Sequence, residues 1–348
     1  MLKTILVPLD GEDRAEYVLP LTARLIHNTR GKLVLLRVVK TATDYWPAIT
    51  TPYPSMMQAV VSEELEEATA YLERVGAEAP LTGLEVITTA RHGVPTPVIL
   101  ATATEYSADL IVMCSHGHTG MAHMIMGSGA EKIARYSTIP VLIVREKEGL
   151  PEASPTEISQ PLRVLVPLDG STHAQAVFEP VADLLTALAS PTQKAAIHLV
   201  RVVEGQRQAA TLMEESKDEM QRAARGLSKA KRHLSWMTEL IREGTIAPAI
   251  SSKQQIVVTW SVALDTDVAR AIVRTAEAGE DAEGAGVFGG CELIAMSTHG
   301  RSGLHHLAIG SVTERVLHAT KRPLLIIRPA FATNRQQSFL EEDESVLG

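Results

Sequence analysis

Apolar runs and amphipathic stretches alternate along the first part of the chain. The apolar runs contain mostly aliphatic and β-branched residues and do not alternate with polar ones, which is typical of parallel strands covered on both faces. They lie at 4–9, 32–39, 85–90, 109–113 and 140–144. Helical patterns lie between them, at 13–28, 57–77, 95–106 and 128–137. This alternation predicts a doubly wound parallel sheet with helices on both sides.

The same pattern occurs twice in the chain. ILVPLDG at 5–11 recurs as VLVPLDG at 164–170, and LVLLRVV at 33–39 recurs as IHLVRVV at 197–203. DLIVM at 109–113 and PVLIVR at 140–145 recur as ELIAM at 292–296 and PLLIIR at 323–328. Because all four pairs keep their order, we interpret the chain as a tandem duplication.

The duplication predicts an α/β protein of two tandem doubly wound domains, each with a five-stranded parallel sheet. We expect a first domain at 1–145, a polar linker at 146–161, a second domain at 162–330 and a disordered acidic tail at 331–348. The second copy differs by a long polar helix around 206–242 and a glycine-rich insert at 279–290, just before its fourth strand.

The last strand of each copy is predicted to lie at a sheet edge. The runs 141–144 and 324–327 are apolar, and each follows a proline. Bare apolar edges promote aggregation. We therefore expect the two domains to pair through these strands as a pseudo-twofold unit, and we also expect a homodimer of the whole chain.

Composition narrows the possible functions. The 348 residues are 45% hydrophobic but only 4% aromatic, which favours aliphatic cores, and the net charge of −8 argues against nucleic acid as a partner. No apolar stretch reaches the roughly 18 residues that a membrane span needs. Two cysteines and an N-terminus without an export signal lead us to expect a cytoplasmic protein.

A glycine-spaced loop follows the fourth strand in both copies. Ser115-His116-Gly117 is followed after nine residues by Gly127-Ser128, and Thr298-His299-Gly300 by Gly310-Ser311. Ser128 and Ser311 each precede a glutamate by three positions, which predicts a capping box at a helix start. A glycine before a helix N-terminus lets an anion approach free N–H groups and the positive end of the helix dipole. The loops therefore predict a phosphate cradle.

The other end of such a site is expected at the first strand. In open α/β sheets, ligands bind beyond the carboxyl ends of the strands, where the strand order reverses. Asp10 and Asp169 stand there, and a carboxylate can accept hydrogen bonds from an adenine amine or ribose hydroxyls. In the second copy, Arg301 follows the glycine directly, where its cation can meet phosphate oxygens.

Structural explanations of the same residues remain open. Asp-Gly after a strand is often only a turn, and duplication copies packing as faithfully as function. Without a paired nucleophile, His116 and His299 are interpreted as loop-stabilising or phosphate-contacting residues rather than bases. Cys114 is interpreted as a small buried residue rather than a redox sensor. The Walker A and Rossmann glycine patterns are absent from the sequence.

At these residues the chain resembles the universal stress protein family in its tandem two-domain form, over roughly 1–145 and 162–329. Nucleotide-binding members carry Gly-x-x-Gly, nine residues and then Gly-Ser/Thr. Both copies here keep the second and third glycines and the serine, whereas Cys114 and Ser297 replace the first glycine. The resemblance implies an adenine nucleotide α-hydrolase-like fold that binds ATP, with or without Mg²⁺, in the α/β pockets. It also places the adenine contact after the second strand on Val38 and Val202.

The candidate binding residues are Pro8, Asp10, Val38, Ser115, His116, Gly117, Gly127, Ser128 and Gly129 in the first copy, and Pro167, Asp169, Val202, Thr298, His299, Gly300, Arg301, Gly310, Ser311 and Val312 in the second. No catalytic or metal-binding residue is predicted.

Three function classes compete. The leading hypothesis is a regulatory module of the stress response that binds an adenine nucleotide with little or no turnover, at most weak ATP hydrolysis. The alternatives are a scaffold that binds no nucleotide and, third, an adenylating enzyme of related fold. The adenylating enzyme would need a Ser-Gly-Gly-x-Asp-Ser loop where this chain has PLDGED. The sequence does not decide which of the two pockets is occupied.

Overall fold

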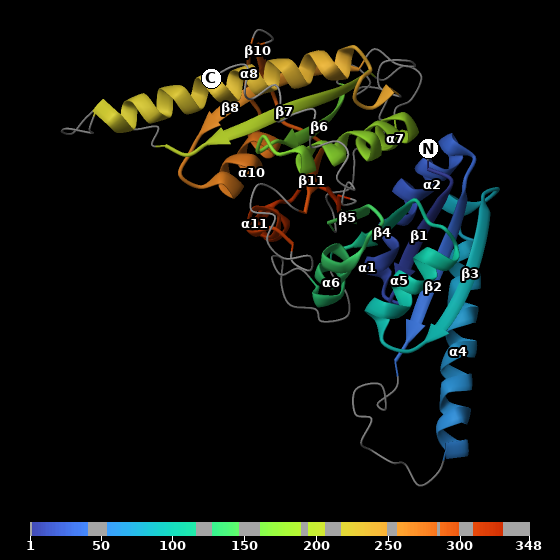
Figure 1. Cartoon of the computed structure of the whole chain (residues 1–348). Helices are drawn as coiled ribbons and strands as arrows, with labels where there is room; N and C mark the ends of the chain where they lie inside the picture. The colour runs from blue at the N-terminus through green and yellow to red at the C-terminus, as the bar shows by residue number, and fades with distance from the viewer. Residues whose placement is uncertain are drawn as a thin grey trace.

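A single ten-stranded sheet runs through both halves of the chain (Figure 1). The computed structural model describes residues 2–40, 54–115, 127–145, 161–188, 194–205, 217–248, 256–283, 286–298 and 309–329. The strand order is β3-β2-β1-β4-β5-β12-β11-β6-β7-β8. Within each half, all the paired strands of this sheet are parallel. This confirms the predicted α/β class and the five parallel strands per copy.

The first half follows the predicted order of strands and helices. Its elements are β1 (Thr4–Leu9), α1 (Asp13–Glu16), α2 (Leu19–Thr29), β2 (Lys32–Val39), α4 (Pro54–Gly76), the 3-10 turn η1 (Ala79–Leu81), β3 (Glu85–His92), α5 (Pro95–Glu105), β4 (Leu110–Cys114), α6 (Ser128–Tyr136) and β5 (Val141–Val144).

The second half repeats this series with one addition. Its elements are β6 (Leu162–Pro167), the 3-10 turn η2 (Thr172–Val177), α7 (Phe178–Leu188), β7 (Ala195–Val203), α8 (Lys217–Arg242), β8 (Val257–Leu264), α10 (Val268–Ala278), β9 (Glu280–Ala282), β10 (Gly286–Phe288), β11 (Leu293–Ser297), α11 (Ser311–Ala319) and β12 (Leu324–Ile327).

The boundaries of several elements differ from the prediction, and two of these differences have a clear structural reason. The single helix expected at 13–28 is two helices, because α2 starts afresh at Leu19 with Pro20 in its first turn, where a proline is tolerated. The fourth strand begins at Leu110 rather than Asp109. The Asp109 carboxylate instead accepts hydrogen bonds from the backbone N–H groups of Lys3 and Thr4, at 2.7 and 2.9 Å, and so fixes the start of β1.

The glycine-rich insert of the second half forms a small antiparallel sheet from β9 and β10, before the fourth strand of that copy. Of the long helix predicted around 206–242, α8 accounts for Lys217–Arg242, while 206–216 lie outside the described residues. So do 146–160, nearly all of the predicted linker, and the predicted tail at 331–348.

Helices cover both faces of the sheet and create two cores. Side chains from α2, α4, α7 and α8 pack with one set of alternating strand positions, such as Ile5 and Val164. Side chains from α5, α6, α10 and α11 pack with the other set, such as Leu6 and Leu165. Each core contains residues from both halves of the chain, so each core continues across the junction between the halves.

Strands β5 and β12 join the two halves. They pair antiparallel, with Leu142 opposite Leu325 and Val141 opposite Ile326, and all their residues are buried. The pairing of the last strands is therefore confirmed. It relates the halves by a pseudo-twofold axis, and the carboxyl ends of the two sets of parallel strands point in opposite directions.

Polar contacts support this junction on both faces of the sheet. On one face, α2 packs on α7, and the Asn28 amide donates to the Ala187 carbonyl at 2.7 Å. The Arg24 guanidinium donates to the neighbouring carbonyl of Leu188. Both acceptors lie at the carboxyl end of α7, where carbonyls have no partner within the helix. On the other face, Arg135 of α6 contacts Glu314 of α11 at 3.2 Å.

A polar cluster is buried beneath the β9–β10 hairpin. His198 of β7 is fully buried, with Nδ1 2.8 Å from the Thr259 hydroxyl and Nε2 2.9 Å from the Ser261 hydroxyl. Ser261 donates in turn to Glu280 of β9, and the His198 ring lies 4.2 Å from the ring of Phe288 in β10. Burial, with a smaller contribution from the charge of Arg163, lowers the pKa of His198 to about 3.

This histidine makes the stability of the protein depend on pH. An unfolded histidine binds a proton below about pH 6.5, whereas folded His198 stays neutral down to about pH 3, so stability is lost as the pH falls below 6.5. Between pH 7 and pH 5 the loss is about 2 kcal/mol. Urea unfolding should show this loss in the parent and in a His27→Gln control, which changes an exposed histidine of α2. His198→Gln should flatten the dependence; an unchanged slope would contradict the assignment.

Candidate functional site

The strand order of each half reverses between its first and fourth strands. The chain runs outward from β1 to β2 and β3, and then returns to place β4 on the other side of β1. In the second half, β6 and β11 have the same relation. This reversal is where an open α/β sheet leaves room for a ligand beyond the carboxyl ends of its strands.

A tight Asp-Gly turn follows the first strand at both reversals. Gly11 and Gly170 have φ angles of +91° and +90°. The Glu12 N–H donates to Oδ1 of Asp10 at 3.1 Å, and the Ser171 N–H donates to Oδ1 of Asp169 at 2.9 Å. Asp10 is exposed and Asp169 is half-buried. The turn therefore orients each carboxylate through one oxygen while the side chain stays within reach of solvent.

The other residues predicted at this end lie nearby in the sheet. Pro8 is the next-to-last residue of β1, Pro167 is the last residue of β6, and both are half-buried. Val38 and Val202 lie near the carboxyl ends of the neighbouring strands β2 and β7, also half-buried. The register of the parallel pairs places these strand ends side by side.

In each half, a hydrogen bond links the glycine before a helix to the end of the fourth strand. The Gly127 N–H donates to the Ser115 carbonyl at 2.7 Å, and the Gly310 N–H donates to the Thr298 carbonyl at 2.6 Å. Ser115 and Thr298 are buried directly after β4 and β11. These bonds bring the N-termini of α6 and α11 against the ends of the strands that flank the reversal.

The predicted capping boxes are wrong. Gly127 and Gly310, not the serines, are the N-cap residues, with extended ψ angles of 135° and 144°. Their carbonyls accept the first helical bonds, from Glu131 N–H at 3.1 Å and Glu314 N–H at 2.9 Å. The helices begin one residue earlier than a serine cap requires, because the bond to the strand carbonyl holds each glycine in the extended conformation. Ser128 and Ser311 are therefore the first helical residues.

In the second half, the reason for a glycine at this junction is space rather than backbone angle. Gly310 has a φ of −62°, which any residue adopts. A Cβ atom at Gly310 would lie 2.8 Å from the Thr298 carbonyl oxygen, whereas one at Gly129 would meet nothing within 4 Å. Val312, at the position of Gly129 in the second half, shows that a side chain is accommodated there.

Five of the predicted binding residues lie outside the described part of the chain. They are His116, Gly117, His299, Gly300 and Arg301. Their roles in the phosphate cradle stay predictions. Cys114, in place of the first motif glycine, is the last residue of β4 and is buried.

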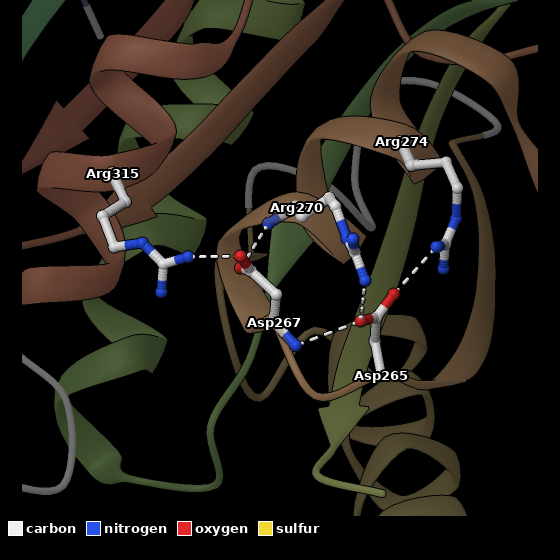
Figure 2. Close-up of polar contacts among 5 residues, drawn as sticks. All are labelled: Asp265, Asp267, Arg270, Arg274 and Arg315. Carbon is white, nitrogen blue, oxygen red and sulfur yellow. Dashed lines mark hydrogen bonds and ion pairs between the residues drawn. The ribbon is translucent and has the colours of Figure 1, made fainter. Parts of the chain in front are cut away.

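A charged network lies at the end of β8 in the second half (Figure 2). The Asp265 carboxylate is 7% exposed and accepts from the Asp267 N–H at 3.0 Å, from Arg270 at 3.0 Å and from Arg274 at 2.8 Å. These bonds, with the Asp267 N–H contributing most, hold the pKa of Asp265 well below its usual range. Asp267 caps α10 and also contacts Arg315 of α11.

The network ties α10 to α11, the helix whose N-cap is Gly310. The first half has no such pattern at the corresponding positions: β3 is followed by Gly93 and Val94 and then by Pro95 of α5. This network is not among the predictions from the sequence. The signal was an Asp-x-Asp pair with arginines three and seven positions after the second aspartate, which match the cap and the next turns of a helix.

One group of potential metal ligands occurs among the described residues. Glu131, Glu314 and His318 bring ligand atoms within 4.8 Å of one another at the junction of α6 and α11. Arg135 already contacts both carboxylates, at 2.8 and 3.2 Å. We therefore interpret the group as an ion-pair cluster between the halves. No helix in the described part of the chain is long and apolar enough to cross a membrane.

Comparisons with known proteins agree with this architecture. The family model described as "Universal stress protein family" matches residues 1–145 and 162–328. The universal stress protein YxiE of Bacillus subtilis is 30% identical over 148 residues, which are 42% of this chain and all of that protein. A universal stress protein of Mycobacterium bovis is 23% identical over 301 residues, covering 85% of this chain and 87% of its own length.

Solved structures show the same fold over nearly the whole chain. The crystal structure of a universal stress protein from Archaeoglobus fulgidus aligns with a TM-score of 0.57 and 18% identity, covering 94% of this chain and 98% of that one. The two family matches correspond to the two halves of the ten-stranded sheet. This chain therefore belongs to the universal stress protein family and carries two of its domains in tandem.

Proposed function

We propose that the protein is a regulatory module of the stress response that binds an adenine nucleotide, ATP with or without Mg²⁺, at the strand reversal of each domain. The observation that carries the proposal is the repeated geometry there. In both domains an Asp-Gly turn and a glycine-capped helix N-terminus flank the same reversal, on the carboxyl side of parallel strands. The carboxylate of the Asp-Gly turn suits hydroxyl and amine donors, and the helix N-terminus suits an anion.

The orientation of the nucleotide follows from charge. A carboxylate repels phosphate, so Asp10 and Asp169 belong at the nucleoside end, near Val38 and Val202. The N-termini of α6 and α11 carry a partial positive charge and belong at the phosphate end. The undescribed glycine loops, with Arg301 in the second domain, would complete the phosphate contacts.

We further propose a binding role with little or no turnover. Efficient phosphoryl transfer needs a carboxylate that holds a metal ion and a residue that orients the attacking water. The acidic residues in the first turns of the phosphate helices, Glu131 and Glu314, are instead bridged by Arg135 at the domain junction. They are therefore poorly placed to hold a metal ion at the phosphates. The alternative is a scaffold that binds no nucleotide. The first experiment below distinguishes the two functions.

Added ATP should raise the melting temperature of the nucleotide-free protein by several degrees. A ligand that binds only the folded state stabilises it by about 2.7 kcal/mol at a hundredfold excess over its Kd. Differential scanning fluorimetry with and without Mg²⁺ measures the shift, and native mass spectrometry of freshly purified protein reports any bound nucleotide. No bound mass and no shift at millimolar ATP would favour the scaffold.

Gly310→Val should abolish ATP binding in the second domain, because the new side chain would collide with the Thr298 carbonyl and displace the helix N-terminus. Asp169→Ala should weaken the same site by about 1–3 kcal/mol, the value of a lost charge-assisted hydrogen bond. Titration calorimetry, which counts sites, measures both. Gly127→Val and Asp10→Ala are the matching changes in the first domain.

Gly129→Val is the matched control for the glycine substitutions. It places in the first domain the residue that the second domain already carries at this position, where the structure has open space. It should leave the number of sites unchanged. If Gly310→Val and Gly127→Val, alone and combined, bind ATP as the parent does, the phosphate-cradle interpretation is wrong.

A further inference from the structure

Both domains carry an arginine in their largely buried second strand. Arg37 of β2 and Arg201 of β7 precede Val38 and Val202 directly, within LLRVV and LVRVV. Arg201 is 7% exposed and Arg37 is half-buried. Burying a guanidinium group is costly unless it finds compensating contacts. The contacts of the two guanidinium groups are therefore informative.

Each guanidinium group packs against the glycine of the Asp-Gly turn. A Cβ atom at Gly11 would lie 2.4, 2.6 and 2.7 Å from Nη1, Cζ and Nη2 of Arg37. At Gly170 the corresponding distances to Nη1, Nη2 and Cζ of Arg201 are 2.9, 2.9 and 3.1 Å. Three atoms of each guanidinium group thus occupy the space that a side chain on the glycine would need. A residue with a side chain at either glycine would have to displace the guanidinium group.

In the first domain, the guanidinium group of Arg37 also packs on an aromatic ring. Its Cζ lies 4.8 Å from the ring centroid of Tyr71 in α4. The Tyr71 hydroxyl donates to Glu16 of α1 at 2.8 Å. Burial and this bond raise the pKa of Tyr71, and the charge of Asp10 adds to the shift. The carboxylate of Asp10 is therefore within electrostatic range of the same cluster.

We propose that Arg37 and Arg201 are the positioning residues of the nucleoside ends of the two sites. Each guanidinium group packs against the glycine of the Asp-Gly turn and holds the turn in place. It thereby determines where the neighbouring Asp10 or Asp169 points. Within the turn, the N–H two residues later donates to Oδ1 of each aspartate, and in the second domain the Ser171 hydroxyl donates to the same oxygen at 2.7 Å. This inference rests on the proposed nucleotide binding and adds that adenosine recognition depends on an arginine that sits beneath the turn.

If Arg37 and Arg201 position the nucleoside ends, removing them should weaken the binding of ligands that contain adenosine and of no others. The variant Arg37→Gln/Arg201→Gln should bind adenosine and ATP on the order of tenfold more weakly than the parent, because both ligands use the nucleoside end. Inorganic tripolyphosphate, which uses only the phosphate end, should bind as tightly as to the parent. Competition against a fluorescent ATP analogue on the full chain measures all three ligands. A purely structural role would weaken all three together.

The control variant is Arg91→Gln/Arg242→Gln. It removes the same number of positive charges, from exposed or half-exposed side chains of β3 and α8, without touching either turn. It should bind all three ligands as the parent does. An equal loss in the control, an equal loss for all three ligands in the test variant, or no loss at all would overturn the proposal.

A second variant keeps the test decisive if the first does not fold. Arg37→Lys/Arg201→Lys retains both charges but replaces the flat guanidinium group with an ammonium group. It should still lose adenosine affinity, because a single ammonium group cannot fill the space beside the glycine that three guanidinium atoms occupy. Adenosine binding equal to that of the parent would overturn the proposal. A parent that binds neither ATP nor adenosine would instead contradict the proposed function itself.

Discussion

The antiparallel pairing of β5 with β12 is the interaction on which the rest of the architecture depends. Each domain ends in an apolar strand that would otherwise leave unpaired N–H and C=O groups at an edge. Pairing the two strands inside one chain removes both edges and continues the sheet through ten strands. It also places α2 on α7 and α6 beside α11, where Asn28 and Arg135 make contacts between the domains.

The same pairing determines how the two candidate sites are arranged. Because β5 and β12 run in opposite directions, the strands of the two halves are antiparallel to each other. Their carboxyl ends therefore point to opposite sides of the molecule. The helices that start at the sites, α6 and α11, nevertheless pack on the same face. Glu131 and Glu314 would repel each other at their meeting point, and Arg135 compensates both charges there.

Duplication preserved the geometry of the strand reversals more closely than the chemistry around them. Asp-Gly turns, glycine caps and the arginine beneath each turn occur in both domains. Among the described residues, the network around Asp265 and the cluster of buried His198 and Ser261 with half-buried Glu280 occur in the second domain and have no counterpart in the first. In the first half, the residue that takes the place of His198 beside β1 is Val34, which is fully buried. Different residues therefore surround the strand reversals of the two domains.

The sequence by itself determined the strands, most helices, the duplication and the pairing of the last strands, because these follow from local apolar patterns and from the cost of bare edges. It also indicated the Asp-Gly turns, whose positive φ angles only glycine adopts readily. The tertiary structure alone decided that Gly127 and Gly310 cap their helices, since a strand carbonyl distant along the chain holds them extended. It also decided the packing of Arg37 under Gly11, which depends on contacts between segments that no local pattern encodes.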